Sequence, residues 1–152
     1  MSVETVRRYF QDNNLDLKVI EFEDSTATVE LAAQVLGVEP DRIAKTMALK
    51  MKSGNIILVT KGGARLDNRK FKDCFKEKGT MISHDEVEDI TGHPIGGVCP
   101  FALKSGLRVY LDVSLKEFDI VYPAGGSASS AVRITPEYLQ QVTGGEWVDV
   151  CK

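Results

Sequence analysis

The sequence lacks a long apolar run, because no stretch of its 152 residues approaches the roughly 20 consecutive apolar residues that a membrane-spanning helix needs. The first residues, MSVETVRRYF, are amphipathic from the third position and contain no apolar core of a signal peptide. We therefore expect a cytoplasmic protein with no membrane partner. The length suits one compact domain, residues 1–152, and is too short for two domains of ordinary size.

Cysteine and histidine are scarce. The three cysteines, Cys74, Cys99 and Cys151, are odd in number and widely separated, which suits reduced thiols better than a disulfide framework or a zinc ribbon. Only His84 and His93 could join them, so we expect no metal site. We also expect no cofactor, since GHPIGG has neither the spacing nor the context of a Walker loop or a dinucleotide fingerprint.

An excess of positive charge is missing as well. The formal net charge of −3 argues against general adhesion to nucleic acid, and hence against DNA as a partner, because such binding depends on many Lys and Arg contacts to phosphate. Residues 61–78 depart from this balance, with seven basic and three acidic side chains. This segment is either a solvated helix face or a landing site for a short polyanion such as a tRNA acceptor end. The candidate contacts are Arg65, Arg69, Lys70 and Lys72.

Apolar periodicity and capping residues predict helices and strands that alternate in a mixed α/β or α+β domain. Thr28 and Gly37 bound one helix, with Leu31 among its inward-facing residues, and Ser83 forms a capping box with Glu86. Helices are expected at residues 2–12, 28–37, 40–44, 68–75, 84–90 and 136–142. Strands are expected at 17–22, 46–51, 56–60, 109–113, 118–122, 131–134 and 147–150, with an antiparallel hairpin formed at the turn sequence SGN.

Lys45 is the first residue whose position is not explained by the stability of the fold alone. It lies where a one-turn helix becomes an apolar strand, so its ammonium should emerge from a partly buried stem. Such a lysine can hold a phosphate or a carbonyl oxygen, and desolvation can lower its pKa far enough for catalysis. The alternative is a lysine whose stem covers the sheet edge while its ammonium stays in water.

Residues 91–101, TGHPIGGVCPF, place three glycines and two prolines in eleven positions. Glycines permit close approach of the backbone to a ligand and prolines stiffen the loop, so backbone N–H groups can form a clamp for an oxyanion or a carbonyl oxygen. The alternative is a connector that needs special backbone angles. A second loop, YPAGGSASS at 122–130, leaves room for a substrate beside its hydroxyls and amides, or is a flexible surface loop.

Cys99 and His93 share the first loop, which raises the question of a thiol nucleophile with an imidazole base. Their spacing of six residues gives no reason to expect the geometry of a dyad, and no obvious third residue orients the histidine. A lone cysteine in a tight loop is more often a packing residue.

Taken together, four segments resemble the YbaK/EbsC family, the stand-alone relatives of the editing domain inserted in bacterial prolyl-tRNA synthetases. They are residues 25–28 (STAT) with the following helix, the junction 42–46 (RIAKT), 92–101 (GHPIGGVCPF) and 122–126 (YPAGG). The resemblance implies an α/β (mixed α+β) fold with a curved, mixed, largely antiparallel sheet surrounded by helices. It also implies hydrolysis of the ester that joins a mischarged amino acid to the terminal adenosine of tRNA.

The resemblance assigns Lys45, Gly96 and Pro100 to catalysis. The lysine matches one that holds the terminal nucleotide, and the other two match a Gly-x-x-x-Pro loop that positions the aminoacyl carbonyl. Members of this family generally lack a protein nucleophile, so a positioned water or a group of the substrate would attack. The expected substrate-binding residues are Phe22, Thr46, Gly97, Val98, Cys99, Gly125, Gly126, Ser127 and Ser129.

The expected partner is the aminoacyl-tRNA acceptor end, and a synthetase partner is left open. The expected substrate is tRNA(Pro) carrying Ala or Cys, with Ser and Thr also open. The stretch SASSA at 127–131 lacks the acidic residue found near there in cysteine-selective members, which weakens an assignment to Cys-tRNA(Pro). Two other functions remain: a non-catalytic adaptor that binds an aminoacyl or tRNA end, and a hydrolase that depends on Cys99.

Overall fold

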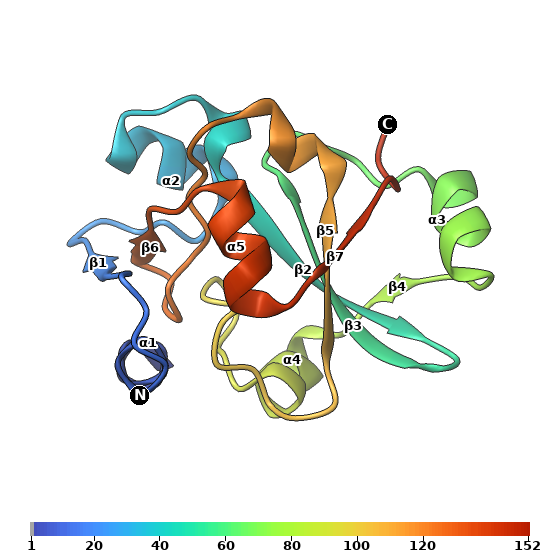
Figure 1. The fold of residues 1–152 in the computed structure, drawn as a ribbon, viewed down its shortest axis with the longest axis horizontal. Coiled ribbons are helices and arrows are strands. Elements are labelled where there is room, and N and C mark those ends of the chain that lie inside the picture. The colour runs from blue at the N-terminus through green and yellow to red at the C-terminus, as the bar shows by residue number, and fades with distance from the viewer. Residues whose placement is uncertain (1) are drawn as a thin grey trace.

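The computed structural model describes residues 2–152, which form a five-stranded sheet, a two-stranded sheet, five α-helices and two short 3-10 helices (Figure 1). The helical elements are α1 (Ser2–Asp12), α2 (Val29–Leu36), η1 (Pro40–Arg42), α3 (Asn68–Phe75), α4 (His84–Thr91), η2 (Val113–Glu117) and α5 (Pro136–Thr143). The strands are β1 (Val19–Glu21), β2 (Ala44–Met51), β3 (Gly54–Lys61), β4 (Thr80–Met81), β5 (Arg108–Asp112), β6 (Ser130–Val132) and β7 (Glu146–Val148). No helix in this described part is long and apolar enough to cross a membrane.

The larger sheet has the strand order β4-β2-β3-β5-β7. β2 and β3 form the predicted antiparallel hairpin, in which Ala44 pairs with Lys61 and Met51 with Gly54. β4 pairs antiparallel with β2, whereas β5 pairs parallel with β3 and β7 parallel with β5. The mixed α/β fold with a mixed sheet is therefore confirmed, and the antiparallel part of this sheet is β4-β2-β3. β1 and β6 form the smaller sheet, which is antiparallel.

Alternate residues of the central hairpin face two hydrophobic cores, as the two-residue period of a strand requires. Ala48 and Ile57 belong to the larger core, which includes residues of α1, α4 and α5. Leu49 and Leu58 belong to the smaller one, which includes Phe71 of α3. Burial of each large apolar side chain stabilises the fold by about 1.5–3 kcal/mol, so the hairpin is a firm base for residues at its ends.

Capping residues set several of the helix ends. Thr28 and Asp67 accept hydrogen bonds from backbone N–H groups at the starts of α2 and α3, and Gly37 ends α2 with φ +69°, as predicted. The predicted capping box at α4 is wrong. Ser83 donates its hydroxyl to the Glu86 carboxylate at 3.0 Å and caps no backbone N–H group, because a charged acceptor lies within reach of the hydroxyl.

Two further predictions are wrong. Leu31 is 40% exposed, because α2 turns Ala32 and Ala33 toward the interior of the protein instead. Residues 118–122 form no strand. This segment makes only isolated bridges, Ile43 with Tyr122 and Val121 with Ile134, and a ladder cannot continue past it because position 123 is a proline without an N–H group.

Candidate active site

A small cavity lies where α2, the start of β2 and the two glycine-containing loops meet. Its volume is about 180 Å³. Sites for drug-sized ligands typically enclose roughly 300–1,000 Å³, so this cavity fits a small chemical group. Its wall is made of residues 26–29, Ala32, residues 43–46, Gly96, Val98, Tyr122, Ala124, Ser130 and Ala131.

The cavity wall unites four residues predicted from sequence: Lys45, Thr46, Gly96 and Val98. It holds no aspartate, glutamate, histidine or cysteine. Small side chains such as Ala27 and Ala124 were not predicted individually, although the segments that contain them were singled out by the resemblance. Their signal in the sequence is weak, because alanine in a cavity wall is indistinguishable from alanine in a core.

The Thr46 hydroxyl stands apart from the other hydroxyls of the wall. Its oxygen is buried and has no hydrogen-bond partner within residues 2–152. By contrast, Thr26 donates to the Ser130 carbonyl at 3.2 Å, and Thr28 accepts from the Leu31 N–H group. Buried hydroxyls without a partner are rare in folded proteins, so this oxygen is a candidate for a hydrogen bond that forms only with a ligand.

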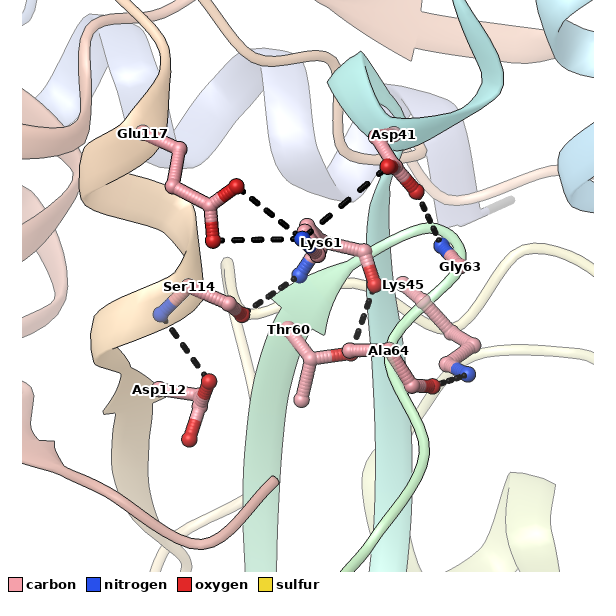
Figure 2. A network of polar contacts seen from close by, with 9 residues as sticks. All are labelled: Asp41, Lys45, Thr60, Lys61, Gly63, Ala64, Asp112, Ser114 and Glu117. Carbon is pink, nitrogen blue, oxygen red and sulfur yellow. Dashed lines mark hydrogen bonds and ion pairs between the residues drawn. The ribbon is translucent and has the colours of Figure 1, made fainter. Parts of the chain in front are cut away.

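Lys45 is partly buried at the start of β2. Its ammonium donates a hydrogen bond of 2.7 Å to the carbonyl of Ala64, which lies in the turn that follows β3 (Figure 2). Ala64 is not part of the cavity wall. The lysine therefore borders the cavity while its charged end is held by a neighbouring turn.

Residues 91–101 and 123–130 meet through backbone atoms beside the cavity. Gly96 has φ +83°, and a Cβ there would lie 3.1 Å from the Cβ atoms of both Ala27 and Ala128. A Cβ at Gly97 would lie 2.6 Å from the Cα and N atoms of Ser127. Glycine is thus needed at both positions, the first for backbone conformation and close packing, the second because another backbone occupies the space.

The other predicted site residues do not line this cavity. Pro100, predicted to be catalytic, and Cys99 are buried within the first loop, and Phe22 is half-buried, with its N–H group bonded to the Ser129 carbonyl. Gly125 lies against Val19, where a Cβ would be 2.5 Å from Val19 Cγ1. The remaining three, Gly126, Ser127 and Ser129, line a second cavity beside α1.

Cys99 and His93 do meet, contrary to the expectation from their spacing, with Sγ 3.5 Å from Nε2. A third residue also orients the histidine, because Ser2 donates its hydroxyl to Nδ1 while Nε2 donates to the Phe101 carbonyl at 2.7 Å. Both side chains are fully buried, however, and burial raises the pKa of the Cys99 thiol to about 12. Burial also lowers the pKa of His93. The pair is a neutral packing contact in which the thiolate is strongly disfavoured.

The basic segment, residues 61–78, includes the turn at Ala64 and continues onto α3, which lies at the edge of the molecule remote from α2 (Figure 1). Arg65, Arg69 and Lys72 are exposed and form no ion pair with any residue in 2–152. Lys70 differs, since its ammonium lies 3.2 Å from the Asp149 carboxylate and 3.0 Å from the Cys151 carbonyl.

Within residues 2–152, no three His, Cys, Asp or Glu side chains gather as a metal site.

The family model of the aminoacyl-tRNA editing domain matches residues 23–142, which include Lys45 and both glycine-containing loops. The chain belongs to this family. The resemblance found in the sequence is thereby confirmed.

The relatives of this chain include a protein of about its own length and much longer tRNA ligases. The protein YwhH of Bacillus subtilis (strain 168), described as uncharacterized, is 46% identical over 154 residues, covering 100% of this chain and 98% of that protein. A proline–tRNA ligase of Kosmotoga olearia is 29% identical over 90 residues, covering 59% of this chain and 16% of the ligase. A solved structure described as a "putative trans-editing enzyme for prolyl tRNA synthetase" superposes with a TM-score of 0.92 at 31% identity, covering 99% of this chain and 97% of that one.

Proposed function

We propose that this editing domain is a trans-acting deacylase that removes a wrongly attached amino acid, Ala or Cys in the first place and Ser or Thr as alternatives, from tRNA(Pro). The observation that supports this most is the small cavity bordered by Lys45 and by the backbone of Gly96. The similarity to the structure described as a trans-editing enzyme points the same way. The aminoacyl-tRNA acceptor end is the corresponding partner, with a synthetase as a further candidate.

The chemistry needs no nucleophile from the protein. A positioned water, or a hydroxyl or side chain of the substrate, adds to the ester carbonyl; the acyl C–O bond then breaks, and with water the products are the free amino acid and the tRNA with a free terminal hydroxyl. An aminoacyl ester is already activated, so exact placement and stabilisation of the carbonyl oxygen supply much of the acceleration. The absence of a carboxylate, imidazole or thiol from the cavity wall agrees with this mechanism.

In this mechanism the two ends of the aminoacyl ester contact different parts of the site. Lys45 holds the backbone or phosphate of the terminal nucleotide at the rim, and the loop from Gly96 to Pro100 positions the ester carbonyl. Small side chains of the wall, such as Ala27 and Ala124, receive the amino-acid side chain, and the Thr46 hydroxyl bonds to a polar group of the aminoacyl moiety. One methylene in such a pocket discriminates by about 1–3 kcal/mol, which favours small side chains without absolute selection.

The acceptor stem would continue over the basic segment. Arg65 follows Ala64 directly, so the unpaired cations begin next to the turn that holds Lys45. Arg69 and Lys72 extend this exposed basic surface along α3 and can bind phosphates, whereas Lys70 would first have to leave Asp149.

Two alternatives remain testable. A non-catalytic adaptor would use the same cavity, and it is favoured by the lack of any general base in the wall. A hydrolase that depends on Cys99 is disfavoured by the burial of that thiol and by its raised pKa.

The test is deacylation of tRNA(Pro) charged with Ala, Cys, Ser or Thr by the wild-type protein and by Cys99→Ala. We expect at least one ester to be hydrolysed, and Cys99→Ala to retain that activity. Binding of the tRNA end without turnover of any ester would replace the deacylase with the adaptor. Loss of turnover in a folded Cys99→Ala variant would instead favour the thiol enzyme.

A further inference from the structure

The turn at residues 61–64 is held from two sides by charged side chains (Figure 2). On one side, Asp41 of η1 accepts a hydrogen bond of 2.8 Å from the Gly63 N–H group. On the other, Lys61 pairs with Glu117 of η2 at 3.0 Å, and its own N–H group donates to the Ser114 hydroxyl. The pairing with Glu117 raises the pKa of Lys61.

The turn is also packed closely against η1. A Cβ at Gly62 would lie 2.1 Å from the Pro40 carbonyl oxygen and 2.7 Å from Val29 Cγ1, so the two backbones are in direct contact. A Cβ at Gly63 would lie 2.4 Å from the Asp41 carboxylate. The two glycines allow the turn to sit against η1, and Asp41 fixes it there.

The only contact that the turn makes with the Lys45 ammonium, among the described residues, is the carbonyl of Ala64 at 2.7 Å. Ala64 follows Gly63 directly, so the direction of its carbonyl depends on how Gly63 is anchored. A lysine stem has several rotatable bonds, and without a fixed acceptor its ammonium would sample many positions around the cavity.

We propose that Asp41, acting through Gly63 and the Ala64 carbonyl, is a positioning residue for Lys45, with the Lys61–Glu117 pair as the second anchor of the same turn. This inference rests on the proposed function, in which Lys45 binds the terminal nucleotide. Asp41 touches no substrate. It fixes the Lys45 ammonium at the 61–64 turn, just outside the cavity wall, so a phosphate at the rim meets a cation already in place.

The chain offers variants that separate this role from a general loss of stability. Asp41→Ala removes the acceptor of the Gly63 N–H group, whereas Asp41→Asn keeps an amide oxygen there; both variants also end the ion pair of Asp41 with Lys61 at 4.0 Å, so they differ at the Gly63 bond. Gly63→Ala disturbs the same hydrogen bond at its donor, because it places a methyl group against the Asp41 carboxylate. Glu21→Ala is the control, because Glu21 is, like Asp41, an exposed carboxylate in an ion pair (53% and 41% exposed), but its partner is Arg7, away from the turn.

The first readout needs no enzymatic activity: the NMR signal of the Lys45 ε-methylene group, assigned by its disappearance in Lys45→Arg. We expect a shift distinct from that of solvent-exposed lysines in wild type, Asp41→Asn and Glu21→Ala, and a shift at the exposed-lysine position in Asp41→Ala and Gly63→Ala. The inference is overturned if the Lys45 signal is the same in wild type and in folded Asp41→Ala.

The second readout is kcat/KM for the ester that wild type hydrolyses. Loss of the anchor should lower it about tenfold in Asp41→Ala and in Gly63→Ala, the scale of one hydrogen bond to a charged group. The double variant should be no worse than either single one, because both break the same link. Additive losses, or an equal loss in Asp41→Asn, would contradict the positioning role. If wild type hydrolyses no ester, the deacylase fails, and the NMR comparison still decides on the network.

Discussion

At the residue scale, the site is distinguished by two polar groups, of which one is hydrogen-bonded and the other is not. The Lys45 ammonium has a partner just outside the cavity wall, and the Thr46 hydroxyl has none within the described chain. A buried unpartnered hydroxyl costs about 1–3 kcal/mol of stability, which the proposed hydrogen bond to a ligand would offset.

Replacing this hydroxyl should therefore separate stability from activity. Thr46→Val keeps the shape and removes the unpartnered group, so the free energy of unfolding should rise by about 1 kcal/mol while kcat/KM for deacylation falls about tenfold. Urea unfolding and deacylation kinetics measure the two effects. The control is Thr26→Val, which should lose about 1 kcal/mol because the Thr26 hydroxyl already bonds to the Ser130 carbonyl. A Thr46→Val variant that is less stable than wild type would show that the hydroxyl has a partner in the free protein.

The buried histidine predicts a pH effect on folding. Burial lowers the pKa of His93 below its ordinary value of 6.5, so the unfolded chain binds the proton first as the pH falls. The stability linked to neutral His93 is complete above pH 6.5 and is lost as the pH falls from there through the lower pKa of the folded state. Urea unfolding between about pH 7.5 and 5 should show a decline in wild type and in His84→Gln, whose histidine is exposed, and a flatter profile in His93→Gln. Equal slopes in all three proteins would contradict this assignment.

At the element scale, the two loops beside the cavity are locked together where backbone meets backbone. Gly97→Ala would push a methyl group against the Ser127 backbone, where neither partner can rotate away. We expect a loss of about 1–3 kcal/mol in the free energy of unfolding, measured by chemical denaturation. Wild-type stability in this variant would mean that the loops separate easily.

Local sequence signals predicted the elements well where one residue decides the outcome. Thr28, Gly37 and Asp67 bound helices because their side chains or backbone angles act within one turn of the chain. The signals failed where distant contacts decide. Residues 118–122 have the composition of a strand but lie between two sheets, and the Ser83 hydroxyl bonds to a carboxylate rather than to the backbone.

The site itself was predictable only in part. Lys45 and Gly96 stand out in the sequence because charge and glycine are unusual at such positions, and both border the cavity. The contact between Cys99 and His93, and the anchoring of Lys45 by the 61–64 turn, depend on backbone paths that spacing does not reveal.

At the scale of the whole molecule, charge is unevenly distributed on a chain with a net charge of −3. The unpaired cations of the basic segment begin beside the Lys45 turn and continue onto α3. This arrangement predicts tRNA binding through a few phosphates, with a modest dependence on salt.

Single substitutions in this segment should weaken tRNA binding without changing which amino acid is removed. Arg65→Ala, Arg69→Ala and Lys72→Ala should each reduce the slope of log K against log salt by about 1. Filter binding over a salt series measures this slope. The control is Lys18→Ala, an exposed lysine beside β1 and outside the segment. Slopes as unchanged in the three segment variants as in Lys18→Ala would place the tRNA elsewhere.

The proposed hydrolysis of aminoacyl esters by the editing domain takes place in the cavity bordered by Lys45. Its most direct test is single-turnover deacylation of Ala-tRNA(Pro) and Cys-tRNA(Pro) by wild type, by Lys45→Ala and by Lys50→Ala, which removes an exposed lysine from the same strand. We predict hydrolysis by wild type and Lys50→Ala, and a loss of at least about 100-fold in Lys45→Ala. Hydrolysis at the wild-type rate by a folded Lys45→Ala protein would contradict the account.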